Sequence, residues 1–332
     1  MVEIYGTLGP RCADEETLRQ MFLCGMTGVR LNLSHTTLRQ AEEMLRTLQR
    51  AAAACGITPR LLMDMQGPEL RLGDLENPVL LTAGEEVSLG TGGLPVPESV
   101  YPWLKPGQPL LLDDGKLLLE VTGQGKNSAS ARVIRGGDLR GRKSIALPES
   151  DILPPALTQQ DRENIRDAAR FGVTGIMQPF VRSADDLITV KEALQEAECP
   201  HIRLFAKIEN MVGVNRLESL LPECDEIVIA RGDLGNAMPL WELPRVQKEI
   251  AALCRARGKP FMVVTQMLAS MERSPVPTRA EVSDIYNAVL DGAASVMVTG
   301  ETAVGDYPAE TIRYLANTAR EAWESRCHIK LS

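Results

Sequence analysis

Short apolar runs alternate with amphipathic stretches along most of this chain. Eight runs have the length and composition of buried strands: Ile4–Leu8, Val29–Asn32, Arg60–Met63, Gly175–Gln178, Arg203–Ile208, Glu226–Ala230, Pro260–Val264 and Ser295–Val298. The clearest stretches with helical periodicity are Asp14–Leu23, Thr37–Ala54, Gln159–Phe171, Ser183–Glu198, Leu243–Arg257, Arg279–Leu290 and Pro308–Trp323. Eight strands alternating with eight helices predict an α/β fold, a (β/α)8 TIM barrel. A doubly wound sheet is the alternative, because sequence alone does not show whether the sheet closes.

The alternation is interrupted after the third apolar run. Residues 74–149 contain short segments of alternating apolar and polar residues, separated by Gly, Pro, Asp and Asn. This pattern is typical of a small all-β domain. The predicted organisation is therefore a catalytic barrel over residues 1–73 and 150–332, with an inserted β lid domain over 74–149. The insertion leaves the barrel at the carboxyl end of its third strand, where it can close over a site.

Composition and charge narrow the class of protein. The chain has 332 residues, 44% hydrophobic and 24% charged, with a net charge of -8, which argues against nucleic acid as a partner. No apolar run is long enough to cross a membrane, and the first residues lack the pattern of a secretory signal. The seven cysteines form no Cys-x-x-Cys pair, so we expect a reduced, cytoplasmic location and no zinc site.

Charged residues stand at the ends of two consecutive predicted strands. Lys207 and Glu209 end one strand and, being two residues apart, point to the same face. Asp233 follows the next strand. Two carboxylates beside an amine suit a divalent cation and a phosphate-like substrate. The alternative is a buried Lys–Glu ion pair with a purely structural role.

Polar residues follow the other predicted strands as well. They are Arg30, Asn32, Ser34, His35, Asp64, Thr265 and Gln266. In a barrel the carboxyl ends of all strands meet on one rim, where active sites are built. Residues suited to metal and to phosphate on the same rim predict a site there, although strand ends are also commonly polar for solvation alone.

Taken together, the motifs of this chain resemble those of the pyruvate kinase family. The motifs that carry the resemblance are Gly6–Pro10, Arg30–His35, Gly67–Arg71, Lys207–Asn210, Ala230–Gly235, Thr265–Met271, Pro277–Glu281 and Gly300–Ala303. They occur in order through nearly the whole chain. The fold that the resemblance implies, a (β/α)8 barrel with a β domain inserted after the third strand, agrees with the pattern above.

The resemblance implies phosphoryl transfer from phosphoenolpyruvate to ADP, which gives pyruvate and ATP. Glu209 and Asp233 would hold Mg²⁺ or Mn²⁺, and Lys207 would stabilise the phosphoryl group and the developing enolate. Arg30 would contact the phosphoryl group. The substrate carboxylate would be bound by the backbone of Gly232 and Asp233 and by Thr265, which would also lie on the path of the proton to the enolate carbon.

The resemblance also implies sites for nucleotide and for K⁺. The nucleotide would be bound by Arg71, Lys143, Asn32 and His35. The K⁺ ligands would be Asn32, Ser34, Asp64 and the carbonyl of Met65. In the family a glutamate in Gly-Pro-Glu accompanies K⁺ dependence, so Glu69 implies that this chain requires K⁺.

The chain departs from the family pattern at several positions. Gln66, Pro179 and Val304 replace a lysine, a serine and a lysine that are common in the family. The alternatives are a metal-dependent lyase, decarboxylase or aldolase acting on pyruvate or oxaloacetate, or a non-catalytic metabolite-binding protein. The sequence stops soon after the eighth helix, so we expect the family's C-terminal regulatory domain to be absent and a homodimer to form through the barrel.

Overall fold

The computed structural model describes all residues except 35, 114, 126, 148–153 and 330–332, and for 327–329 it describes the backbone alone. The chain forms two compact units, one made of Met1–Gly67 and Ala156–Ser332 and the other of Pro68–Pro155.

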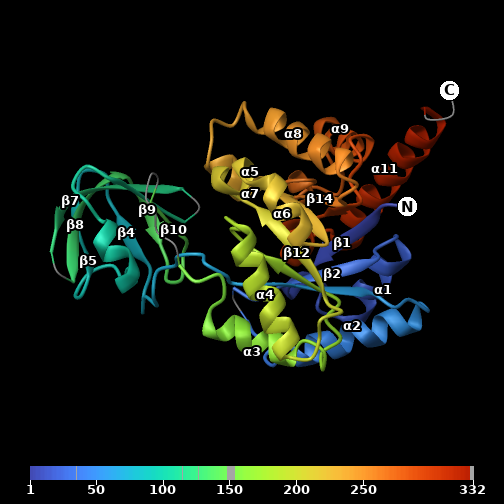
Figure 1. Ribbon diagram of the computed structural model, residues 1–332, viewed down its shortest axis with the longest axis horizontal. Coiled ribbons are helices and arrows are strands. Elements are labelled where there is room, and N and C mark those ends of the chain that lie inside the picture. The colour runs from blue at the N-terminus through green and yellow to red at the C-terminus, as the bar shows by residue number, and fades with distance from the viewer. Residues whose placement is uncertain (35, 114, 126, 148–153, 330–332) are drawn as a thin grey trace. The chain divides into compact units, whose positions relative to one another are not determined.

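Eight parallel strands of the first unit close into a barrel in the order β1-β15-β14-β13-β12-β11-β3-β2 (Figure 1). Their bounds are Glu3–Thr7 (β1), Gly28–Asn32 (β2), Arg60–Asp64 (β3), Gly175–Gln178 (β11), Arg203–Ile208 (β12), Glu226–Ala230 (β13), Phe261–Val264 (β14) and Ser295–Met297 (β15). Closure excludes the doubly wound sheet and confirms the predicted (β/α)8 barrel with an inserted β unit after the third strand.

Helices follow the strands of the barrel. The α-helices are Glu15–Leu23 (α1), Glu42–Ala54 (α2), Gln159–Asp167 (α3), Ala184–Glu196 (α4), Met211–Asn215 (α5), Leu217–Leu220 (α6), Arg231–Asn236 (α7), Leu243–Ala256 (α8), Arg279–Leu290 (α9), Gly300–Ala303 (α10) and Pro308–Ile329 (α11). The 3-10 helices of this unit are Pro10–Cys12 (η1), Leu221–Glu223 (η3) and Ala269–Glu272 (η4). None of the helices within the described ranges is long and apolar enough to span a bilayer.

The helix expected over Thr37–Ala54 begins later than the sequence suggests. The Thr37 backbone N–H donates to the Gln40 side chain at 3.1 Å, and the Gln40 N–H donates to Thr37 Oγ1 at 3.2 Å. These reciprocal bonds are a capping box that closes one turn, but the Glu42 N–H then donates to the Arg39 carbonyl, three residues back, at 3.3 Å. The regular helix α2 therefore starts at Glu42.

Two layers of apolar side chains stabilise the barrel. The outer layer packs between strands and helices, and the inner layer fills the barrel interior. The members of the inner layer are Tyr5, Leu62, Met177, Phe205, Val228, Ala230, Met262, Val264 and Met297. Because side chains alternate along a strand, the inner layer identifies which residues of each strand point inward.

The second unit is built from antiparallel strands. Their bounds are Val79–Leu81 (β4), Glu86–Gly90 (β5), Pro109–Leu112 (β6), Leu117–Gln124 (β7), Ser128–Arg135 (β8), Gly137–Leu139 (β9) and Ile145–Ala146 (β10). One sheet has the order β10-β6-β7-β8-β5, and β4 pairs with β9. The unit begins at Pro68, earlier than the expected residue 74, because Leu72 packs in its apolar core and the Leu72 N–H donates to the Lys143 carbonyl at 2.9 Å.

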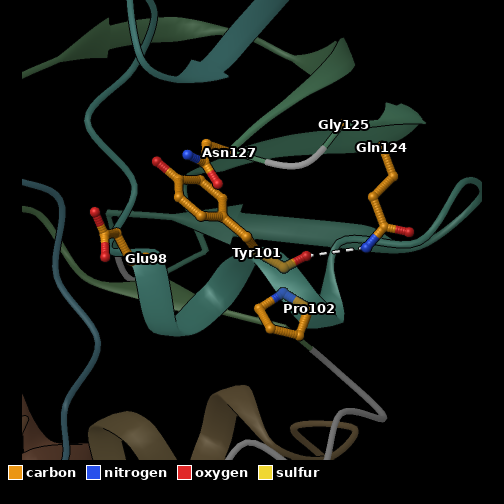
Figure 2. Close-up of a pocket in the computed structure, with 6 residues that line it drawn as sticks. All are labelled: Glu98, Tyr101, Pro102, Gln124, Gly125 and Asn127. Atoms are coloured by element: carbon orange, nitrogen blue, oxygen red, sulfur yellow. Dashed lines mark hydrogen bonds between the residues drawn. The ribbon is translucent and has the colours of Figure 1, made fainter.

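A pocket of about 270 Å³ lies within this second unit, beside the 3-10 helix Glu98–Trp103 (η2) (Figure 2). Its lining residues are Glu98, Tyr101, Pro102, Gln124, Gly125 and Asn127. The Gln124 amide donates to the Tyr101 carbonyl at 3.1 Å across it. Of the predicted site residues that the structure describes, none lines this pocket.

Candidate active site at the mouth of the barrel

The alternation along β12 directs Lys207 toward the barrel axis. Phe205 belongs to the inner apolar layer, and its neighbours on the strand belong to the outer one. Lys207 is two residues beyond Phe205 and therefore shares its face. Glu209 follows at the same spacing just past the end of the strand. The sequence pattern thus places an ammonium and a carboxylate directly above the interior core.

The same alternation operates in β2 and β3. Leu62 lies in the inner layer, so Asp64, two residues later, also points inward. Val29 and Leu31 pack in the outer layer, which leaves Arg30 and Asn32 on the inner face. Asn32 and Asp64 are paired residues in the β2–β3 register. Three strands therefore deliver polar side chains to the carboxyl end of the barrel.

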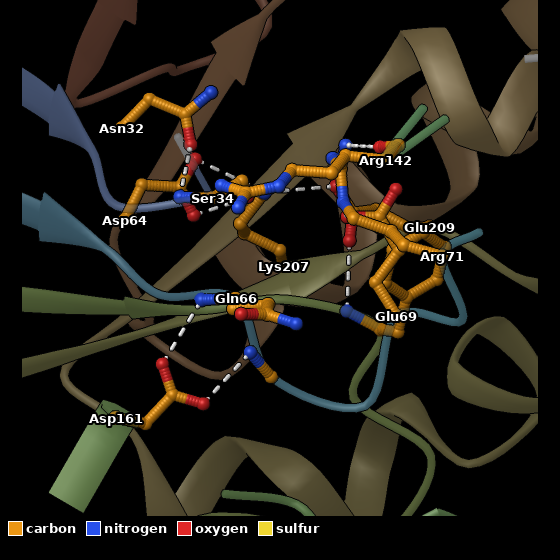
Figure 3. A network of polar contacts seen from close by, with 12 residues as sticks. Asn32, Ser34, Asp64, Gln66, Glu69, Arg71, Arg142, Asp161, Lys207 and Glu209 are labelled. Atoms are coloured by element: carbon orange, nitrogen blue, oxygen red, sulfur yellow. Dashed lines mark hydrogen bonds and ion pairs between the residues drawn. The ribbon is translucent and has the colours of Figure 1, made fainter. Parts of the chain in front are cut away.

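Four of the charged side chains, Arg30, Asp64, Lys207 and Glu209, form one connected ion cluster. Figure 3 labels Asp64, Lys207 and Glu209. Lys207 Nζ lies 3.1 Å from Asp64 Oδ1 and 3.1 Å from Glu209 Oε1. Arg30 Nη2 lies 2.6 Å from Asp64 Oδ2. All four side chains are mostly buried, with Glu209 and Asp64 nearly inaccessible. The Lys–Glu pair of the structural alternative is therefore present, and it is part of a larger polar site.

Burial and neighbouring charges set the protonation states of the cluster. Burial alone would lower the pKa of Lys207, but the carboxylates of Asp64 and Glu209 outweigh it and hold that pKa above its ordinary value. Burial likewise opposes ionisation of Asp64, yet Lys207 and Arg30 keep its pKa low. Lys207 is thus a fixed cation, and Asp64 is its fixed counter-ion.

Glu209 behaves differently, although it also contacts Lys207. Burial raises its pKa, Lys207 lowers it, and the carboxylates of Asp233 and Asp64 raise it further. The carboxylates of Asp233 and Asp64 therefore disfavour ionisation of Glu209 by charge repulsion. A divalent cation between Glu209 and Asp233 would remove this repulsion, so the donor set fits Mg²⁺ or Mn²⁺. Within the described ranges no cluster of three or more Asp, Glu, His or Cys suited to a metal occurs.

The residues predicted for K⁺ lie together on β2, β3 and the loops that follow them. The Ser34 N–H donates to Asn32 Oδ1 at 3.1 Å, and Asp64 pairs with Asn32 across the two strands. Met65 follows Asp64 and is buried. Side-chain and backbone oxygens are the ligands that K⁺ accepts, and a K⁺ site at these residues stays a prediction. His35, predicted to bind nucleotide, lies outside the described residues.

The loop after β14 brings Thr265 onto the start of α7. The Gly232 N–H donates to Thr265 Oγ1 at 2.7 Å, and Thr265 Oγ1 donates to the Val264 carbonyl at 2.5 Å. Thr265 and Gln266 both have positive φ, 73° and 53°. A β-branched residue rarely adopts this conformation, which costs on the order of 1–3 kcal/mol for each strained residue. Gly232 and Thr265, which were both predicted to bind the substrate carboxylate, are thus in direct contact within a strained turn.

The predicted nucleotide-binding cations Arg71 and Lys143 belong to the second unit. They lie on adjoining backbone segments, because Arg71 pairs with Ser144 in an isolated antiparallel bridge. Arg71 Nη2 lies 2.7 Å from Glu69 Oε2 (Figure 3), and Lys143 Nζ lies 2.8 Å from Asp113 Oδ1. The sequence motif Gly-Pro-Glu-Leu-Arg thus supplies an arginine together with its own counter-ion.

Two groups at the barrel rim, the Phe180 N–H and the Asp161 carboxylate, were not predicted from the sequence. The Phe180 N–H donates to Glu209 Oε2 at 2.7 Å, and Phe180 has a positive φ of 49°. The buried Asp161 carboxylate accepts from the N–H groups of Gln66 and Gly67, both at 3.0 Å, and so fixes the chain just before the second unit. A backbone donor leaves no mark in a sequence. Asp161 was detectable as the last residue of a Thr-x-x-Asp capping box, which predicts a helix start but not a second set of partners.

Comparison with known proteins identifies the family of the chain. Residues 1–312 match the family model "Pyruvate kinase, barrel domain". The chain is 36% identical to a pyruvate kinase of Bacillus licheniformis over 99% of its own length and 58% of the relative. It is 37% identical to a pyruvate kinase of Geobacillus stearothermophilus (96% and 56%) and 37% identical to one of Aeropyrum pernix (97% and 71%). The chain therefore spans little more than half the length of the first two relatives. Because residues 1–312 of its 332 residues match the family's barrel model, the chain belongs to the pyruvate kinase family.

Proposed function

We propose that this chain transfers the phosphoryl group of phosphoenolpyruvate to ADP, producing pyruvate and ATP. One observation carries the proposal beyond family membership: Lys207 is held between Asp64 and Glu209 while Arg30 pairs with the same Asp64. Phosphoryl transfer depends on positioned cations more than on covalent chemistry. Two cations fixed by one buried carboxylate match that requirement.

Each side chain of the cluster has a defined task in the proposed reaction. Lys207, which stays protonated, faces the transferring phosphoryl group and stabilises charge that develops on the enolate oxygen. Arg30 binds the phosphoryl oxygens. Asp64 orients both cations and remains ionised. Thr265, held against Gly232, binds the substrate carboxylate and lies beside the path of the proton.

Glu209 and Asp233 would hold Mg²⁺ or Mn²⁺, which when bound supplies Lewis-acid stabilisation to the substrate's oxygens. Arg71 and Lys143, both in the second unit, would bind the nucleotide phosphates. The second unit would act as a lid over the bound nucleotide. Homodimer formation through the barrel stays a prediction.

A coupled assay tests the proposal directly. The full chain is incubated with Mg²⁺, K⁺, ADP and phosphoenolpyruvate, and pyruvate is measured through NADH oxidation by lactate dehydrogenase. We expect pyruvate to appear in a one-to-one ratio with ATP. Absence of turnover in a folded protein that binds phosphoenolpyruvate and Mg-ADP by calorimetry would contradict the proposal. Binding of the keto acid alone would instead favour the lyase alternative.

Potassium dependence is a separate prediction. In this proposal Asn32, Ser34, Asp64 and the Met65 carbonyl would supply oxygen ligands to a K⁺ beside the ion cluster. We expect omission of K⁺ to weaken the apparent affinity for phosphoenolpyruvate by about tenfold, a usual coupling between two ligands. The measurement compares KM in K⁺ with KM in tetramethylammonium at equal ionic strength. Equal values would remove both the K⁺ site and the interpretation of Glu69.

A further inference from the structure

The strained Thr265–Gln266 turn is held by a side chain to which the proposed reaction assigns no role. The Thr265 carbonyl accepts two hydrogen bonds from Arg231, one from Nε at 3.2 Å and one from Nη2 at 2.7 Å. Arg231 is the first residue of α7, directly before Gly232. One arginine thus ties the end of β14 to the start of the helix on the neighbouring strand.

Arg231 is itself anchored on its remaining side. Its Nη1 lies 2.6 Å from Asp284 Oδ2 on α9, and Nη2 also lies 2.9 Å from Met267 Sδ. All three guanidinium nitrogens therefore have partners, and the side chain is only 10% exposed. A lysine offers a single ammonium at this place and cannot reproduce the planar fork.

Helix α9 fixes the far end of the same loop. Its first turn is closed by a capping box between Thr278 and Glu281. The Glu281 carboxylate also accepts from Ser270 N–H at 2.7 Å and from Ser270 Oγ at 2.6 Å. Asp284, through Arg231, and Glu281, through Ser270, thus hold residues 265–270 at both ends. The anchoring explains how two consecutive non-glycine residues are kept at positive φ.

We propose that Arg231 is a positioning residue for the transfer reaction. Anchored by Asp284, it keeps the Thr265 carbonyl in place, so that the Thr265 hydroxyl stays on the Gly232 N–H at the mouth of the barrel. This inference rests on the proposed function, in which Thr265 meets the substrate. Without the fork, the 265–266 peptide is free to relax to ordinary φ values, and the hydroxyl moves away from Gly232.

Kinetics of Arg231→Lys and Asp284→Asn test the proposal. We expect kcat to fall about 10²-fold for Arg231→Lys, the usual effect of a misplaced reacting group, with KM for ADP changed less than about threefold. We expect a smaller decrease in kcat for Asp284→Asn. The double variant should be no slower than Arg231→Lys, because Asp284 acts through Arg231. One matched control is Arg245→Lys, whose side chain forms an exposed ion pair on α8. The other is Asp291→Asn, whose partly buried side chain follows α9 and pairs with the exposed Lys248.

Amide hydrogen exchange of Gly232, followed by NMR on the labelled full chain without substrate, gives a readout independent of activity. We expect exchange at Gly232 to be at least tenfold faster in Arg231→Lys than in wild type, with Arg245→Lys unchanged. Unaltered kcat and unaltered exchange in Arg231→Lys would overturn the inference, and so would strictly additive effects of the two variants. If wild type lacks turnover while the exchange difference is present, the proposed function fails and the positioning by Arg231 stands.

Discussion

Replacing Lys207 by methionine should reduce kcat for phosphoryl transfer by about 10³-fold or more, because the loss removes a fixed cation from a site with little access to water. Lys207 Nζ contacts Asp64 and Glu209, and both carboxylates raise its pKa, so wild type carries this charge at every pH of interest. Methionine keeps an unbranched apolar stem but lacks the ammonium group. The coupled assay with saturating ADP and phosphoenolpyruvate measures the effect.

The stability of this variant must be measured alongside its activity. Deleting one member of a buried ion cluster typically costs about 3–5 kcal/mol. Lys207→Arg therefore accompanies it, because arginine keeps the charge while displacing it. We expect Lys207→Arg to remain folded by circular dichroism and still to be severely slowed. Lys191→Met, which removes an exposed lysine paired with Glu223, is the matched control and should retain full activity. Near-wild-type turnover in Lys207→Met would contradict the proposed role of Lys207 in stabilising the phosphoryl group and the enolate.

The barrel could be predicted because its determinants are local. The strand Arg203–Ile208 has the expected bounds, since its mostly apolar residues are delimited by a turn on one side and by Glu209 and Asn210 on the other. The helix Arg279–Leu290 also has the expected bounds, because Thr278 and Glu281 form a capping box that is visible in the sequence. The helix expected over 37–54 was less accurate, because the capped turn at Thr37 is separated from the regular helix by a bond from the Glu42 N–H to the carbonyl three residues back.

The ion cluster shows where sequence reasoning ends. The spacing of two residues places Lys207 and Glu209 on one face, and this was predicted. The contact between Lys207 and Asp64 joins residues 143 positions apart, and it depends on the strand order β12-β11-β3 and on the register. Arg231 was part of a recognised motif, yet its fork on the Thr265 carbonyl depends on a backbone conformation that no residue type signals. Local sequence patterns predicted which residues belong to the site. Their partners depend on strand order, register and backbone conformation, which the local sequence does not specify.

Replacing Glu209 by glutamine should abolish stabilisation of the protein by Mg²⁺ and remove part of its pH dependence. In wild type under a chelator, burial and the carboxylates of Asp233 and Asp64 raise the pKa of Glu209. The contribution of such a group to stability is full below the ordinary pKa of glutamate and is lost as the pH rises through the raised value. Wild type should therefore lose stability toward alkaline pH, and Mg²⁺ should restore it by about 2.7 kcal/mol at 100 times its Kd.

The matched control for this experiment is Glu226→Gln. Glu226 is also buried, its pKa is also raised, chiefly by burial, and it accepts from Ser295 while pairing with Arg203 at 2.8 Å. It stands at the amino end of β13, opposite the candidate site. Both glutamates thus give the same sign of pH dependence, but only Glu209 adjoins Asp233. Thermal melts at pH 5.5 and 8.5, with chelator or Mg²⁺, should show the Mg²⁺ response in wild type and Glu226→Gln and none in Glu209→Gln. A Mg²⁺ response that persists in Glu209→Gln would place the cation elsewhere and separate the metal from the Lys207 cluster.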